Sequence, residues 1–121
     1  MQTKIILKGR VPSKKNSRMI VMRGNRPMSL PSQQYKDWHE EQSWFLKSLS
    51  HLNIENCTIT QTFFAPDKRA TDLSNKAESI NDLLVDNGVL KDDNWFVISS
   101  LHLEFGGVDK ENPRVEIIIN H

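Results

Sequence analysis

The stretch TDLSNKAESINDLLVDNGVLKDDNW, residues 71–95, decides the fold of this chain. When its residues are placed at 100° intervals, the apolar side chains fall on one narrow stripe, which is typical of a helix that packs on a core. The stripe consists of Leu73, Ala77, Ile80 and Leu84. Most polar residues, namely Asn75, Glu78, Asp82 and Asp86, fall on the opposite side. The pattern predicts a helix over residues 73–86.

Polar residues mark both ends of this helix. Thr71 or Asp72 can supply a side-chain oxygen to its first amides, and Asn87-Gly88 is a common helix stop. A short loop then leads to Asp93 at the start of a predicted strand. If this loop returns the chain to where the helix began, Asp72 and Asp93 share a pocket.

Carboxylates in one pocket repel each other, so a cation or a shared proton is needed to offset their charge. Oxygen ligands with one or two carboxylates suit Mg²⁺ or Mn²⁺. The alternative is that Glu78, Asp82 and Asp86 form a solvated helix face and that Asp92-Asp93 is a polar turn.

The rest of the chain predicts an α+β domain in which two helices pack on one face of a mixed sheet. The elements follow the order β-β-α-β-α-β-β. Strands are expected at residues 3–8, 18–22, 56–64, 95–105 and 113–119, and helices at 32–50 and 73–86. We expect a single domain over residues 1–121.

The first helix carries a stripe at alternating spacings of three and four, which indicates a core or subunit interface and less often a surface for stacking on bases. The stripe consists of Tyr35, Trp38, Gln42, Phe45 and Leu49. His39 and His51 have no evident partner and are expected at the surface. The lone Cys57 is expected to be a buried apolar side chain.

The composition is that of an ordinary globular protein, with 37% hydrophobic and 26% charged residues. No apolar run is long enough for a membrane span or a signal peptide, so we expect a cytoplasmic protein with no membrane partner.

The net charge is only +1, but the cations are unevenly distributed. Nine of the 16 lysines and arginines precede Asp37, in a segment without any acid. We expect residues of the loop that follows the first strand, together with cations next to Asp72, to contact phosphates. The candidates are Lys14, Lys15, Asn16, Arg18, Lys68 and Arg69. The alternative is that these cations keep edge strands soluble.

The order D-L-x-N, then D-L-L, then G-V-L-x-D-D, over residues 66–95, resembles the RusA-type Holliday-junction resolvases. The GRVPSKKNSR segment at residues 9–18 is similar to the opening of the same family. The resemblance implies a RusA-like fold, a homodimer, and an Mg²⁺-dependent endonuclease that resolves branched DNA by paired nicks. Mn²⁺ can substitute, and no small-molecule cofactor is expected.

In the terms of this resemblance, Asp72 and Asp93 hold the metal, assisted by Glu78 or Asp82. Asn75 is expected to fix a carboxylate or cap local backbone. The family usually has an acid at the place of Ser74 and a lysine at the place of Glu78. We hypothesise that the Glu78 carboxylate compensates for the missing acid, and that Lys76 supplies the missing charge as a catalytic residue.

These departures leave two other functions open. One is a protein that binds branched DNA with weak or no catalysis, and the other is a dimeric structural protein that does not touch DNA.

Overall fold

The computed structural model describes residues 1–13 and 18–121. These described residues form six strands, two α-helices and one short 3₁₀ helix. They are β1 (Gln2–Lys8), β2 (Arg18–Arg23), β3 (Arg26–Pro31), α1 (Gln33–Leu46), η1 (Lys47–Leu49), β4 (Cys57–Ala65), α2 (Leu73–Asp86), β5 (Ile98–Val108) and β6 (Arg114–Asn120).

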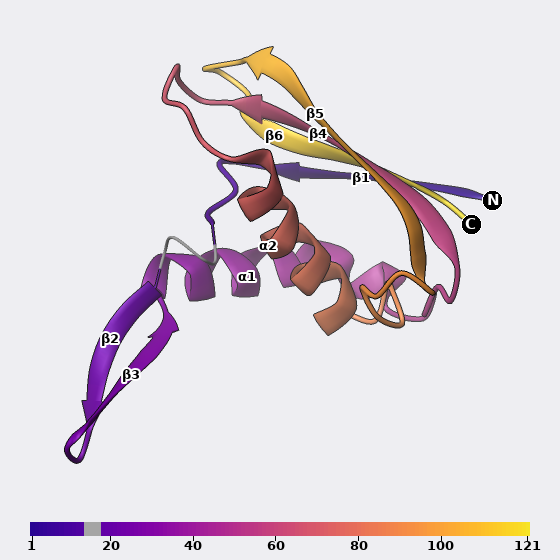
Figure 1. Cartoon of the computed structure of the whole chain (residues 1–121). Helices are drawn as coiled ribbons and strands as arrows, with labels where there is room; N and C mark the ends of the chain where they lie inside the picture. Colours follow the sequence, from indigo (N-terminus) through magenta and orange to yellow (C-terminus); the bar gives the residue numbers. More distant parts are fainter. Residues whose placement is uncertain (14–17) are drawn as a thin grey trace.

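The main sheet has the strand order β1-β6-β4-β5 and is mixed, because β4 pairs in parallel with β5 and antiparallel with β6. Both α-helices lie on one face of this sheet (Figure 1). The predicted α+β class, with two helices covering one face of a mixed sheet, is therefore confirmed. Neither helix in the described part of the chain has the length and apolar character that a membrane crossing requires.

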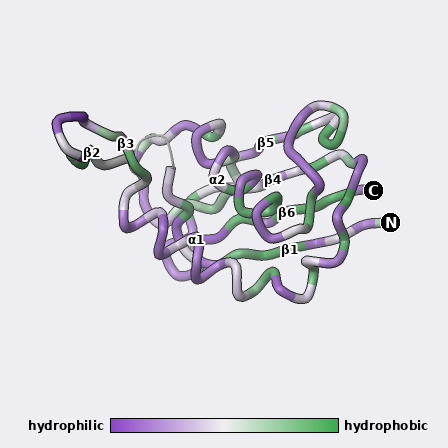
Figure 2. The backbone as a smooth tube through the Cα atoms, turned by 90° about the horizontal axis from the view of Figure 1, so that it is seen from below, coloured by the Kyte–Doolittle hydropathy of each residue, from purple (hydrophilic) through white to green (hydrophobic). Residues whose placement is uncertain are grey.

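Side chains that alternate along the strands form the core beneath the helices. Val115, Ile117 and Ile119 of β6 are fully buried, as their alternation predicted. On the helix side, Ile80, Leu83 and Leu84 of α2 are also fully buried. Figure 2 shows the resulting contrast between hydrophobic stretches of the sheet and the hydrophilic turn of the β2–β3 hairpin.

The bounds of α2 agree with the predicted helix, and Gly88 follows it in the left-handed region with φ 73°. Asp72 is the N-cap residue, but its side chain makes no capping hydrogen bond, so the prediction is wrong for Asp72. The buried arc of α2 is also wider than the apolar stripe, because Asn75, Lys76 and Ser79 are buried as well.

Several other predictions need correction. Residues 26–31, for which no strand was predicted, form β3, which pairs with β2 as a separate hairpin that projects from the body (Figure 1). Strand β5 begins at Ile98 and not at residue 95, because the Asn94 side chain accepts hydrogen bonds from the amides of the next turn.

The helix α1 buries Leu46 and leaves Phe45 exposed, since its buried stripe continues at an interval of four residues after Gln42. His39 has a partner after all, because its Nε2 lies 2.8 Å from Oδ2 of Asp86. His51 is exposed, as expected.

Candidate functional site

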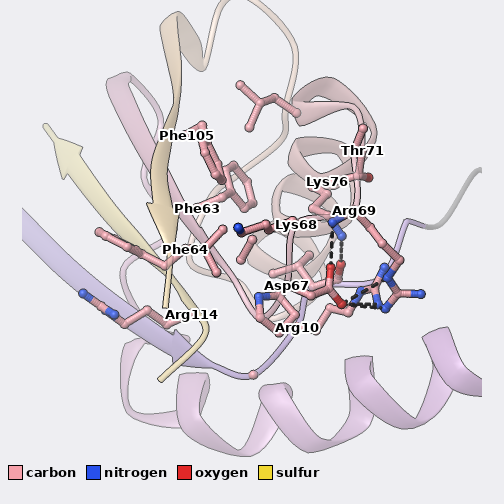
Figure 3. Close-up of a pocket in the computed structure, with 17 residues that line it drawn as sticks. Arg10, Phe63, Phe64, Asp67, Lys68, Arg69, Thr71, Lys76, Phe105 and Arg114 are labelled. Carbon is pink, nitrogen blue, oxygen red and sulfur yellow. Dashed lines mark hydrogen bonds and ion pairs between the residues drawn. The ribbon is translucent and has the colours of Figure 1, made fainter. Parts of the chain in front are cut away.

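A cavity of about 390 Å³ lies where β4 ends and α2 begins (Figure 3). It is built by the segment after β1, the end of β4 with the following loop, the start of α2, the end of β5 and the start of β6. Its lining contains a set of cationic and a set of aromatic side chains: Arg10, Lys68, Arg69, Lys76 and Arg114, with Phe63, Phe64 and Phe105. Among the described residues that line the cavity, Asp67 supplies the one carboxylate.

Asp67 and Arg69 form a local ion pair on one side of this cavity. The Asp67 carboxylate accepts hydrogen bonds from the backbone amide and the Nε of Arg69, both at 3.0 Å. These bonds hold the pKa of Asp67 below its ordinary value. Arg10 lies 4.0 Å from the same carboxylate, whereas Lys68 is exposed. Three cations, Arg10, Arg69 and Lys76, thus interact with one acid, and Lys68 lines the same cavity, so this rim favours an anion.

Lys76 is buried and, together with Ser79, anchors Val11 and Pro12 in the segment that follows β1. Its Nζ donates a hydrogen bond to the carbonyl of Val11, and one turn later Ser79 Oγ donates to the carbonyl of Pro12 at 2.7 Å. Burial, followed by the charges of Arg10 and Arg69, lowers the pKa of Lys76. An anion in the cavity would offset this repulsion.

The opposite wall is aromatic. Phe63 is buried, while Phe105 on the edge strand β5 is 57% exposed. Arg114 lies 3.8 Å over the ring of Phe64 and is paired with Glu116 and Asp109, at 2.8 and 3.0 Å. Its charge is therefore already balanced.

Asp72 lies next to this cavity, between two residues that line it, Thr71 and Leu73. Its carboxylate is exposed and accepts a hydrogen bond of 3.2 Å from Nδ2 of Asn75, which confirms the prediction that Asn75 fixes a carboxylate. Asp72, Lys68 and Arg69 are thus gathered at the start of α2.

The carboxyl end of α2 is acidic. Burial, then the charges of Asp92 and Asp82, raise the pKa of Asp93, so these carboxylates lie close enough to repel. Asp86 lies on the last turn of the helix. The negative end of the helix dipole adds to their charge. This end of the molecule therefore attracts cations.

The structure separates Asp72 from Asp93 within one chain. The loop after α2 does not return to the start of the helix, because Lys91 donates its amide to the carbonyl of Ile54 just before β4. Asp93 lies beside Asn81 and close to Asp82, in the second half of α2, whereas Asp72 precedes the first turn. Nine helical residues, about 14 Å along the axis, therefore separate the two places. Glu78 is exposed between them, and Asp82 lies nearer to Asp93.

The donor chemistry suits a divalent cation, but one chain does not assemble the complete set. In residues 1–13 and 18–121, no group of three or more histidine, cysteine, aspartate or glutamate side chains could hold a metal ion. A site that contains both Asp72 and Asp93 would have to draw them from two copies of the chain.

The predicted phosphate contacts Lys14, Lys15 and Asn16 lie outside the described residues, as does the side chain of Arg18. Sequence reasoning missed Arg10 and the aromatic wall, above all Phe105. The signal for Arg10 was its position one residue after Gly9, which follows a strand. No local pattern places it beside Asp67, 57 positions later.

No protein-family model matches this chain, and no curated protein sequence matches it.

Proposed function

We propose that the protein is a divalent-metal-dependent endonuclease that acts on branched DNA as a homodimer. The observation that carries this proposal is the group of cations, Arg10, Lys68 and Arg69, around a cavity beside Asp72. Lysine and arginine side chains at a concave surface bind DNA phosphates, and a neighbouring carboxylate can then act on the bound backbone.

The separation of Asp72 from Asp93 supports a site shared by two copies. A twofold axis that places two α2 helices antiparallel brings the start of one helix to the end of the other. The basic start then meets the acidic end, so the charges are complementary. Trp95 and Phe96, which are 79% and 77% exposed beside Asp93, offer apolar surface for such a contact.

In this arrangement Mg²⁺ would be held by carboxylate oxygens of Asp72 from one copy and of Asp93 from the other. Glu78 or Asp82 would assist them. When bound, Mg²⁺ supplies positive charge to the phosphate and lowers the pKa of a water molecule. The chain itself positions the strand through Lys68 and Arg69. Asn75 orients the Asp72 carboxylate, and Lys76 holds the backbone of Val11 in place after β1.

A second candidate function is binding of branched DNA without efficient cleavage. The separation of the carboxylates within one chain favours it, and so does the presence of Ser74 and Glu78 in place of an acid and a lysine. Such a protein would retain the basic cavity but would not assemble a metal site.

Incubation with a labelled four-way junction in Mg²⁺, Mn²⁺ or EDTA tests the proposal. We expect metal-dependent products that disappear in Asp72→Asn and in Asp93→Asn. Asp37→Asn, an exposed acid on α1, serves as the matched control and should leave cleavage unchanged. Junction binding without metal-dependent products would favour the second function. If binding is absent even at low salt, where phosphate contacts are strongest, the protein does not act on DNA.

A further inference from the structure

We infer that the cavity at the start of α2 receives one unpaired nucleotide of the DNA strand, with its base against Phe105 and its phosphate against Lys68 and Arg69. This inference deepens the proposed function and rests on it, because it names the part of the branched substrate that this surface selects.

The cavity has the shape and size for such a ligand. Its volume of about 390 Å³ falls within the range of small-molecule sites, roughly 300–1,000 Å³. One of its walls lies at the edge of the sheet, because the lining residue Phe105 belongs to the outermost strand, β5. Because the site is concave, a base stacked inside a duplex cannot reach its walls, whereas an unpaired or extruded base can.

The two walls differ in chemistry in the way that a nucleotide requires. In Figure 3, Phe63 and Phe105 lie on the side formed by β4 and β5, and Asp67 and Arg69 lie on the side next to α2. Phe105 is 57% exposed and carries no ring contact or cation over its face among the described residues, so its face is free for stacking. Stacking on an aromatic ring is tolerant of base identity.

The cationic wall carries more positive charge than the Asp67 carboxylate balances. Asp67 can balance one of its neighbours Arg10 and Arg69, and Lys68 has no ion-pair partner within the part of the chain that the structure describes. A phosphate placed here would contact Lys68 and Arg69 and would offset the repulsion that Arg10 and Arg69 exert on buried Lys76. A phosphate alone, however, would leave the aromatic wall uncovered.

The test measures binding and not cleavage. A short single strand that carries 2-aminopurine reports stacking by fluorescence, and a labelled single strand and a labelled duplex report affinity by anisotropy. We expect quenching of 2-aminopurine on binding, and a loss of about tenfold in single-strand affinity in Phe105→Ala with little change for duplex. Phe105→Leu, which keeps an apolar side chain, should lose the quenching as well.

Phe45→Ala is the matched control, because Phe45 is an exposed phenylalanine on α1 (67%) that does not line this cavity. For the phosphate contact, Lys68→Gln should reduce the salt dependence of single-strand binding by about 0.7 in log–log slope, whereas Lys36→Gln on α1 should not. Equal single-strand affinity in Phe105→Ala and Phe45→Ala would overturn the inference. The inference would also be overturned if inorganic phosphate competed with the single strand as well as a deoxynucleoside monophosphate does.

These outcomes are separate from those of the cleavage assay. Phe105-dependent quenching without any metal-dependent product would leave the nucleotide site in place and reject the nuclease. Metal-dependent cleavage together with unquenched 2-aminopurine would reject the nucleotide site alone.

Discussion

Mixing two inactive variants tests whether the carboxylates act across two copies of the chain. Asp72→Asn and Asp93→Asn are purified separately, then combined under conditions that allow subunits to exchange. The geometry predicts the outcome, because Mg²⁺ binds its oxygens at about 2.0–2.1 Å, so two ligands of one ion lie within about 4 Å of each other. Within one chain Asp72 precedes α2 and Asp93 lies beside Asn81, nine residues further along the helix, so the two are separated by about 14 Å along its axis.

In a mixed dimer one site carries both substitutions, and the other site carries neither. Random exchange makes about half of the dimers mixed, and each has one intact site of two. We therefore expect nicking at about a quarter of the wild-type rate. Paired cleavage should remain absent, because it requires two intact sites in the same dimer.

A supercoiled plasmid with an extruded cruciform separates these activities, since one nick gives an open circle and paired nicks give a linear product. Each variant exchanged with itself is the control for residual activity, and Asp37→Asn mixed with wild type controls for the exchange procedure. If wild type is active and native mass spectrometry detects the mixed dimer, yet the mixture is no more active than its components, the shared-site reasoning is wrong.

Three further predictions concern single positions. Tyr35 is the chain's one tyrosine, and burial followed by the charges of Asp82 and Asp86 raises its pKa to about 12. Since the folded state favours the protonated form, its stabilising contribution is complete below pH 10 and is lost as the pH rises toward 12. Urea unfolding across this range should show the loss, and Tyr35→Phe should abolish it.

Gly88→Ala should lower the free energy of unfolding more than Gly24→Ala does. Both glycines have positive φ, and an alanine in that conformation costs about 1–2 kcal/mol of stability. Only at Gly88, however, would the new Cβ lie 2.7 Å from a backbone oxygen, that of Ser50. Chemical denaturation measures the difference. Finally, Ser74→Asp should raise metal-dependent cleavage and Glu78→Gln should lower it; a rise in the first with no change in the second contradicts the compensation by Glu78.

The elements that were predicted well are those whose signals are local. The bounds of α2 follow from a 3.6-residue apolar period and a glycine stop, both of which lie inside residues 73–88. Strand β6 follows from alternation of Val115, Ile117 and Ile119. By contrast, β3 was missed because a strand in an isolated hairpin packs on little else, so it has no buried alternation to reveal it.

The candidate site was predicted only in part, because local signals do not report contacts between residues that are far apart in the sequence. Lys68, Arg69 and Asp72 are neighbours in sequence, so their gathering at the start of α2 could be anticipated. The burial of Lys76 depends on the carbonyl of Val11, 65 positions away. The partner of His39 lies 47 positions away, on another helix.

The sequence by itself determined where α2 and most strands begin and end, which faces are apolar, and that carboxylates mark both ends of α2, whereas α1 ends at Leu46 and not at residue 50. Only the tertiary structure decided that those ends stay apart and that Arg10 and Phe105 join one cavity. Periodicity and capping act within a few residues, whereas strand pairing joins distant segments: Lys8 pairs with Arg114, and Phe63 pairs with Phe105. Local patterns do not encode those pairings, so the shape of the site emerges only when the sheet forms.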